Sequence, residues 1–252
     1  MMGLEAAAEA IRKARHAIAL TGAGISTDSS IPDYRGPNGV WTLDPGAERR
    51  AYEAYEVFKM DPVRYWMEGY GRHVLLDRFL DSIPNKGHLA LYNLEREGHI
   101  KMTITQNIDD LHRKAGNANL IEFHGNATRL RCVGCSSRYG IGDKEVPRCP
   151  KCDSILKSDV VHFGEPIPGD TMRRSMEEVG RSDVMLICGT SAVVHPFASL
   201  PSIMKGNDPN NTVIEVNLSE TQLTRDGVSD IFIKGNTSDI LSGLYNYLHD
   251  VV

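Results

Sequence analysis

The 252-residue sequence contains no hydrophobic run that approaches the length needed to cross a membrane. The stretch VMLIC, residues 184–188, is among its longest. Residues 1–15 alternate alanine with charge and lack the apolar core of a signal peptide. We therefore expect a cytoplasmic protein that does not bind membranes.

The sequence also has no excess of positive charge. Its formal net charge is −5, whereas proteins that bind nucleic acids usually carry a basic patch. We therefore expect no direct binding of nucleic acid. Internal repeats and low-complexity tracts are absent too. With 41% hydrophobic and 24% charged residues, the composition is that of an ordinary globular protein, and the length suits one α/β domain with a smaller module.

Cysteine is scarce and unevenly placed. Four of the five cysteines form two C-x-x-C pairs, Cys132 with Cys135 and Cys149 with Cys152. In a reducing compartment such pairs indicate a metal site rather than disulfides, and a redox protein would need only one pair. Four thiolates complete a tetrahedral Zn²⁺ shell and leave no open position, so we predict one structural zinc. Cys188 lies within an apolar run and is interpreted as a small buried side chain.

Apolar segments alternate with segments of helical periodicity, which predicts a doubly wound parallel sheet. The cysteine segment, 132–152, has little apolar periodicity and cannot build a core of its own. We predict strands at 17–20, 100–105, 119–124, 183–189, 212–217 and 230–235. We predict helices at 4–15, 47–59, 62–80, 86–97 and 169–180, with a helical or loop stretch at 195–205.

The stretch TGAGISTDSSIPDYRG, residues 21–36, begins like a dinucleotide-binding loop. Gly22 and Gly24 follow an apolar strand directly, but Thr27 stands where a Rossmann fingerprint has its third glycine. The chain then continues to an acid, an aromatic residue and a base at 33–35. The pattern predicts phosphate binding and disfavours an ordinary dehydrogenase.

Polar residues follow several of the predicted strands, at the edge where parallel sheets bind ligands. Gln106, Asn107 and Asp109 offer the donors and acceptors that a ribose and a carboxamide need, although Asn107 or Asp109 could instead cap a helix. His124 ends another strand and could transfer protons or be structural. The stretches GTS at 189–191 and VNLSE at 216–220 suit phosphate and ribose.

Together these stretches resemble the sirtuin family of NAD-dependent protein lysine deacylases. The matching motifs are GAGIS, IPDYRG, TQNIDDLH, FHGN, the two cysteine pairs, SDVVHFGEPIP, GTSAVVHP and EVNLSE, in family order. The resemblance implies a Rossmann-like NAD-binding domain formed by residues 1–39, 99–126 and 158–252. It implies a small domain made of a helical insertion, 40–98, and a zinc ribbon, 127–157. NAD would be consumed: the acyl group of a protein lysine passes to ADP-ribose, and nicotinamide and O-acetyl-ADP-ribose are released.

The resemblance also implies roles for individual residues. The expected catalytic residues are His124 as the general base, with Asn107, Asp109 and Arg35. The expected NAD contacts are Gly22, Ala23, Gly24, Ser26, Asp33, Tyr34, Arg35, Gln106, Asn107, Ile108, Asp109, Gly189, Thr190, Ser191, Asn217 and Leu218. The acyl-lysine peptide would pair as an extra strand with Val161, His162, Phe163 and Gly164.

Some positions depart from the family pattern. Ser30 replaces the usual glycine, and Tyr34 replaces the usual phenylalanine. One subgroup recognises succinyl-lysine and malonyl-lysine through a Tyr-x-x-Arg pair. Here Arg72 matches the arginine, but Gly69 occupies the tyrosine position and Tyr70 comes one residue late. Arg72 could therefore bind an acyl carboxylate or be a solvated surface residue.

Other functions are compatible with parts of this pattern. A protein ADP-ribosyltransferase would use the same cofactor and cleft. An NAD-dependent binding module would not need a histidine, an amide and a carboxylate together. A zinc-ribbon adaptor for DNA is disfavoured by the negative net charge.

Overall fold

A computed structural model describes residues 2–249 and contains a six-stranded parallel sheet, here called the large sheet. Its spatial order is β3-β2-β1-β7-β8-β9, so the order reverses between β1 and β7. Every residue of β1 and β7 is buried, which explains their uninterrupted apolar sequences. The strands are β1 (Ala17–Thr21), β2 (Met102–Thr105), β3 (Leu120–Glu122), β7 (Val184–Cys188), β8 (Thr212–Asn217) and β9 (Ile231–Lys234). The predicted doubly wound parallel sheet is confirmed.

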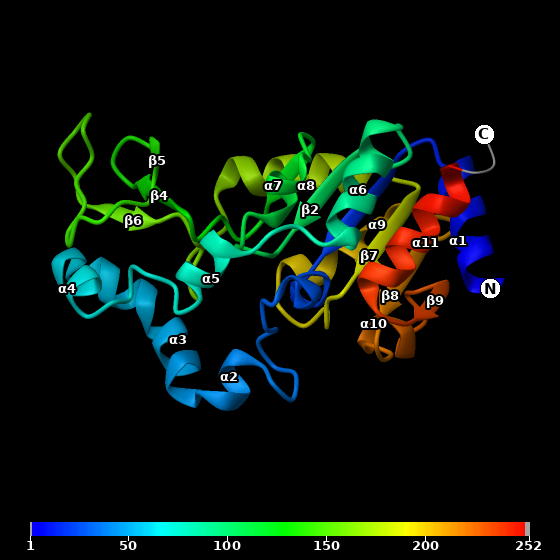
Figure 1. Cartoon of the computed structure of the whole chain (residues 1–252). Coiled ribbons are helices and arrows are strands. Elements are labelled where there is room, and N and C mark those ends of the chain that lie inside the picture. The colour runs from blue at the N-terminus through cyan, green and yellow to red at the C-terminus, as the bar shows by residue number, and fades with distance from the viewer. Residues whose placement is uncertain (1, 250–252) are drawn as a thin grey trace.

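Helices cover both faces of the large sheet (Figure 1). On one face, α1 (Met2–Lys13), α6 (Lys86–Arg96) and α11 (Thr237–His249) share one hydrophobic core with the strands. On the other, α8 (Gly169–Arg181) and α9 (Leu200–Asn207) contribute Val179, Leu200 and Met204 to a second core. Short elements connect these layers: α7 (Leu111–Ala115), α10 (Gln222–Arg225), η1 (Ala23–Ile25), η2 (Thr27–Ser29) and η3 (Phe197–Ser199).

A second unit, here called the small module, lies at the opposite end of the molecule from α1 and α11 (Figure 1). It combines an antiparallel sheet, in the order β5-β4-β6, with four helices. Its elements are β4 (Arg129–Cys132), β5 (Arg138–Gly140), β6 (Leu156–Ser158), α2 (Val40–Leu43), α3 (Pro45–Met60), α4 (Pro62–Met67) and α5 (Leu76–Asp81). Phe58, Tyr65 and Trp66 from the helices pack against Leu130 and Leu156. The cysteine segment thus obtains its core from the helical insertion.

The predicted helix at 62–80 is wrong at its centre. Helix α4 ends at Met67 and α5 begins only at Leu76. Gly69 has a φ of +81°, which a helix does not allow. A Cβ on Gly71 would lie 2.3 Å from the Trp66 ring, so the backbone passes directly over that side chain. The turn that results brings residues 69–74 to the wall of the cavity described below.

The packing of α6 bears on the proposed domain boundaries. Ala90, Leu91 and Leu94 belong to the core of the large sheet, although the predicted helical insertion spans 40–98. We therefore propose that the insertion ends before α6. No helix within residues 2–249 is both long and apolar enough to cross a membrane.

Candidate active site

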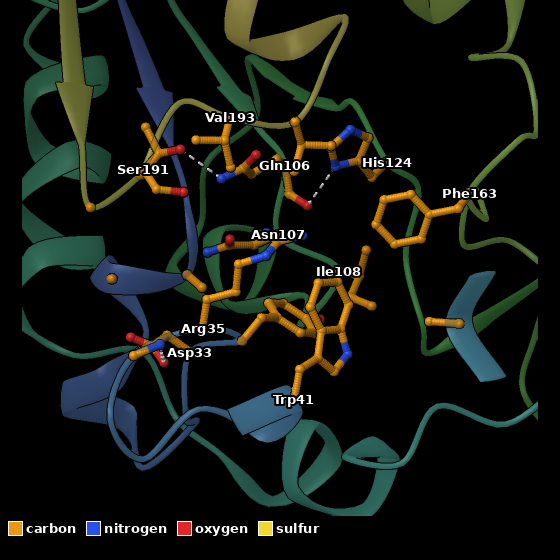
Figure 2. Close-up of a pocket in the computed structure, with 18 of the residues that line it drawn as sticks. Asp33, Arg35, Trp41, Gln106, Asn107, Ile108, His124, Phe163, Ser191 and Val193 are labelled. Atoms are coloured by element: carbon orange, nitrogen blue, oxygen red, sulfur yellow. Dashed lines mark hydrogen bonds between the residues drawn. The ribbon is translucent and has the colours of Figure 1, made fainter. Parts of the chain in front are cut away.

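A cavity of about 1110 Å³ opens at the carboxyl ends of the large sheet's strands and extends to the small module. Loops that follow β1, β2, β3, β7 and β8 line it, together with residues 160–167 and parts of α3. It therefore lies where the strand order reverses, which is where open α/β sheets bind ligands. Figure 2 shows side chains from several of these loops converging on it.

The glycine loop after β1 packs against the loop after β7. The Gly24 N–H donates to the Gly189 carbonyl at 2.8 Å, and a Cβ on Gly24 would lie 2.7 Å from the Gly189 Cα. A Cβ on Gly22 would lie 2.4 Å from the Gln106 side chain. The chain then enters two short 3₁₀ turns rather than a long helix. In a Rossmann fold the third glycine allows a long helix to pack closely against the sheet. No such helix follows β1 here, so Thr27 can occupy that position.

The polar residues after β2 divide into two groups. Gln106 and Asn107 line the cavity; Gln106 donates to the Thr190 hydroxyl at 2.8 Å, and Asn107 donates to the Gly22 carbonyl at 3.1 Å. The Asp109 carboxylate lies behind the cavity wall. It accepts hydrogen bonds from the Ser26 hydroxyl at 2.7 Å and from the Leu111 N–H, the first residue of α7. Burial raises the pKa of Asp109.

Within residues 2–249, only one ring nitrogen of His124 has a hydrogen-bond partner. Its Nδ1 lies 3.2 Å from the Gln106 carbonyl oxygen (Figure 2). A carbonyl can only accept, so Nδ1 carries the proton and Nε2 is left as a proton acceptor. Burial lowers the pKa of His124 to about 4, so the imidazole is neutral at neutral pH. The ring has the tautomer and charge state that a general base requires.

The loop that follows the second 3₁₀ turn folds back on itself at the cavity. The Gly36 N–H donates to the Asp33 carboxylate at 2.9 Å, and the Trp41 N–H donates to the Tyr34 carbonyl at 3.0 Å. The Arg35 guanidinium lies 4.5 Å from the Trp41 ring centroid. Asp33, Tyr34 and Arg35 all line the cavity. The acid, the aromatic residue and the base at 33–35 therefore face one space.

The residues predicted for the adenosine and phosphate side also line the cavity. They are Gly189, Thr190, Ser191, Asn217 and Leu218. The Asn217 side chain donates to the Thr190 carbonyl at 2.9 Å, which joins the end of β8 to the loop after β7.

The four paired cysteines form one cluster in the small module. Their sulfur atoms all lie within 4.8 Å of one another, with Cys132 and Cys152 at 3.4 Å and Cys135 and Cys149 at 3.6 Å. Thiolates at about 2.3 Å from a zinc ion lie about 3.8 Å apart in a tetrahedron. The donor set and its size fit one Zn²⁺, held between the end of β4 with the turn that follows it and the turn before β6. This supports the predicted structural zinc.

Residues 22–196 match the model of the Sir2 family. The chain belongs to the Sir2 family. It is 41% identical to the NAD-dependent protein deacylase of Thermococcus kodakarensis, over 98% of this chain and 96% of that protein. A solved Sir2 homologue–NAD complex superimposes with a TM-score of 0.84 at 38% identity, covering 98% and 94% of the two chains. The structure of Sir2Tm bound to a propionylated peptide superimposes with a TM-score of 0.79 at 28% identity, covering 99% of each chain. The resemblance to the sirtuins is thereby confirmed.

In this sirtuin the four residues predicted to bind the peptide, 161–164, line the cavity. The Val161 N–H donates to the His124 carbonyl at 2.8 Å, which ties this segment to the expected base. Phe163 stacks on Tyr52 with ring centroids 4.2 Å apart. Arg72 lines the cavity too, but its guanidinium donates to the Gly142 carbonyl at 2.7 Å.

Three of the predicted NAD contacts, Gly22, Ser26 and Asp109, do not line the cavity of this sirtuin; they stand behind the residues that do. Conversely, Arg225, Asn236 and Thr237 line it without having been predicted. The last two belong to GNTS, residues 235–238, directly after β9. Its similarity to GTS, residues 189–191 after β7, is a signal that could have identified it.

Proposed function

We propose that this sirtuin is an NAD-dependent protein lysine deacetylase. It transfers the acyl group from lysine to ADP-ribose and releases nicotinamide and O-acetyl-ADP-ribose. The observation that carries this proposal is the Nε2 of His124, which has no hydrogen-bond partner among residues 2–249; His124 lines the same cavity as Gln106, Asn107 and the segment 161–164. One space thus offers a base, a place for a ribose and a place for an extended peptide.

Each group of lining residues has a role in this proposal. The backbone around Ala23, Gly24 and the 189–191 loop would hold the pyrophosphate, with Asn217 and Leu218 near the adenosine ribose. NAD, when bound, supplies the ribose carbon that the acyl oxygen attacks as nicotinamide leaves. Loop 33–41 would cover that carbon and exclude water, which competes with a weakly nucleophilic amide oxygen.

His124 would then accept a proton from a ribose hydroxyl at Nε2. The Gln106 carbonyl keeps the other ring proton on Nδ1, so the acceptor nitrogen remains directed away from that bond. Asn107 would orient the ribose. Asp109 would act indirectly, because its carboxylate fixes the Ser26 hydroxyl, which itself accepts from the Asn107 amide at 3.2 Å.

The acyl group that we propose is acetyl, with succinyl as a further substrate that depends on Arg72. Gly69 provides no phenol, and the Tyr70 hydroxyl donates to Glu53 at 3.2 Å. The Tyr-x-x-Arg pair is therefore incomplete.

We also propose that the enzyme acts in the cytoplasm. The clustered thiols support this location, because they need a reducing compartment.

The test is incubation with NAD and an acetyl-lysine peptide. Nicotinamide should appear in step with deacetylated peptide, and His124→Ala should lower kcat at least 100-fold because a positioned base contributes about that much. His16→Ala is the matched control, since His16 precedes β1 at the opposite edge of the sheet. Full activity of His124→Ala would refute the assignment of the base. ADP-ribose found on the peptide by mass spectrometry, without loss of acetyl, would instead indicate an ADP-ribosyltransferase.

A further inference from the structure

A charged side chain without a role in the reaction is buried beside the proposed peptide segment. The side chain of Lys157, on β6, is 0% exposed. Its ammonium group donates to the Val160 carbonyl at 2.5 Å and pairs with the Glu165 carboxylate at 3.0 Å. A buried ammonium is costly unless it is paired and hydrogen-bonded, so these two contacts determine where residues 160 and 165 can lie.

Glu165 holds the other end of the same segment. One carboxylate oxygen, the one paired with Lys157, accepts from the His162 N–H at 3.0 Å. The other accepts from the Arg131 guanidinium at 2.5 Å. The Glu165 N–H donates to the His162 carbonyl at 3.0 Å and closes a turn. A single carboxylate therefore joins the segment to β4 and to β6.

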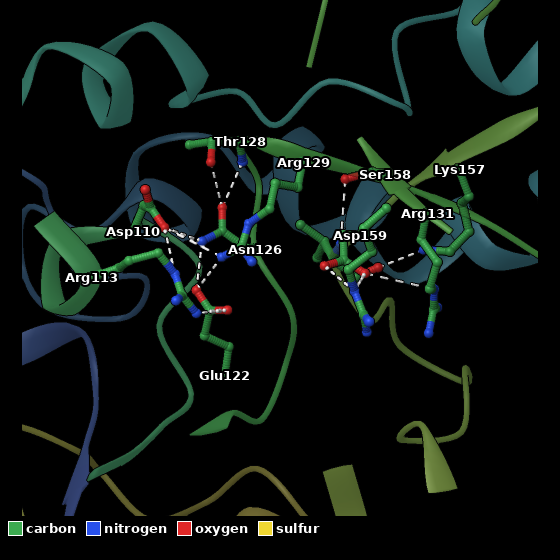
Figure 3. Close-up of polar contacts among 12 residues, drawn as sticks. Asp110, Arg113, Glu122, Asn126, Thr128, Arg129, Arg131, Lys157, Ser158 and Asp159 are labelled. Carbon is green, nitrogen blue, oxygen red and sulfur yellow. Dashed lines mark hydrogen bonds and ion pairs between the residues drawn. The ribbon is translucent and has the colours of Figure 1, made fainter. Parts of the chain in front are cut away.

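The cluster includes further charged side chains of the small module, and Figure 3 shows Lys157, Arg131 and Asp159 among them. Arg131 precedes Cys132 on β4, and its Nε lies 3.7 Å from the Asp159 carboxylate. Arg138, on β5, donates to the same carboxylate at 3.1 Å. All three strands of the antiparallel sheet in the small module thus contribute a positively charged side chain to the cluster around residues 159–165.

Among the described residues, the segment leaves the backbone groups of Phe163 and Gly164 free. The N–H groups of Val161 and His162 are used inward, by the His124 carbonyl and by Glu165. Within residues 2–249, the N–H and carbonyl of Phe163 make no hydrogen bond. Residues 161–162 lead into the turn at 162–165, and free backbone groups at this position on the cavity wall can pair with a peptide laid alongside as an added strand. Such pairing requires that the donors and acceptors of the segment keep fixed positions.

We propose that the ion cluster of Lys157, Glu165, Arg131 and Asp159 positions residues 161–164 for peptide pairing. Through this cluster, the antiparallel sheet of the small module supports the proposed peptide segment. Its members are positioning residues, because they act through the backbone of the segment and not on the reacting atoms. This inference rests on the proposed function, and it predicts an effect on peptide affinity that NAD affinity does not share.

The test measures peptide affinity directly, together with turnover. The probe is a fluorescein-labelled acetyl-lysine peptide, whose dissociation constant is measured by anisotropy for the wild type, Lys157→Met, Glu165→Gln and Lys157→Arg. Loss of one or two pairing hydrogen bonds should weaken binding by Lys157→Met and Glu165→Gln about tenfold, equivalent to about 1.4 kcal/mol. Lys157→Arg keeps the positive charge and should bind within threefold of the wild type. KM for NAD should stay within twofold throughout.

Lys205→Met is the matched control. Lys205 also pairs with a carboxylate, Asp230 at 2.7 Å, and donates to a carbonyl, but it lies on α9 away from the cavity. The Lys205→Met variant should have a lower melting temperature than the wild type but the same peptide affinity. The positioning role is overturned if Lys157→Met binds peptide like the wild type, or if peptide and NAD affinities fall by the same factor. If the wild type binds the peptide but never deacylates it, only the proposed function is refuted. The positioning role is still tested by comparing the peptide affinities of the variants with that of the wild type.

Discussion

Acidification should unfold this protein over a narrow range of pH, because several histidines are buried in neutral form. Burial lowers the pKa of three of them to about 4 and of two others well below the usual 6.5. The five are His73, His88, His112, His124 and His162. In the unfolded chain each would titrate near 6.5. Below that pH the unfolded state binds more protons than the native state, so stability falls as the pH falls.

The magnitude follows from the number of protons. At full slope each proton is equivalent to about 1.4 kcal/mol per pH unit. Between pH 7.5 and 5.5 one such histidine lowers the free energy of unfolding by about 1.3 kcal/mol, and five lower it by about 6 to 7 kcal/mol. The total for a domain is about 5–15 kcal/mol, so unfolding near pH 5 is expected. The raised pKa values of Asp109 and Asp159 oppose this trend, because these carboxyl groups bind protons at a higher pH in the native state than in the unfolded chain.

The assay is urea unfolding followed by circular dichroism at pH 7.5, 6.5 and 5.5, with excess zinc in every buffer. His112→Leu removes one buried imidazole and should reduce the loss of stability by about 1.3 kcal/mol. His249→Leu is its control, because that side chain is 57% exposed. A total loss below about 2 kcal/mol, or histidine NMR signals that titrate near 6.5 in the native state, would refute the reasoning.

Two further substitutions test the walls of the cavity. Gly24→Ala should destabilise the protein by about 1–3 kcal/mol and raise KM for NAD at least tenfold, because the new methyl group would lie 2.7 Å from the Gly189 backbone. Gly180→Ala is the control and should have neither effect, because a Cβ at that position meets no atom within 4 Å. Unchanged KM would show that the loop can move aside. Arg72→Ala should leave the acetyl-lysine rate within twofold and lower the succinyl-lysine rate at least fivefold. An unchanged succinyl rate would remove Arg72 from the acyl site.

Much of the architecture was predictable because it depends on local chemistry. Strands that are buried on both faces must be apolar along their whole length, so β1 and β7 were recognisable as continuous runs. The spacing of the cysteines likewise reflects what a tight turn and a tetrahedral ion require. The polar motifs identified the site because parallel strands deliver their carboxyl ends to one edge.

Other features were decided by contacts between segments far apart in the chain. Helical periodicity continues through 62–80, and only the packing of Trp66 against the backbone at Gly71 shows why the helix breaks. The same holds for α6 and α11, which both join the core of the large sheet through their apolar faces; α11 is not among the helices that the sequence predicts. Periodicity states that a face is buried but not which partner covers it.

The site shows the same division between residue type and placement. Sequence alone determined which side chains could do chemistry: His124, Gln106, Asn107 and the four cysteines. Only the tertiary structure decided that Asp109 bonds to Ser26 behind the cavity wall, and that Lys157 and Glu165 meet beside residues 161–164, the proposed peptide segment. The physical reason is that a residue's chemistry is a property of its side chain. Its desolvation and its partners are properties of the folded chain.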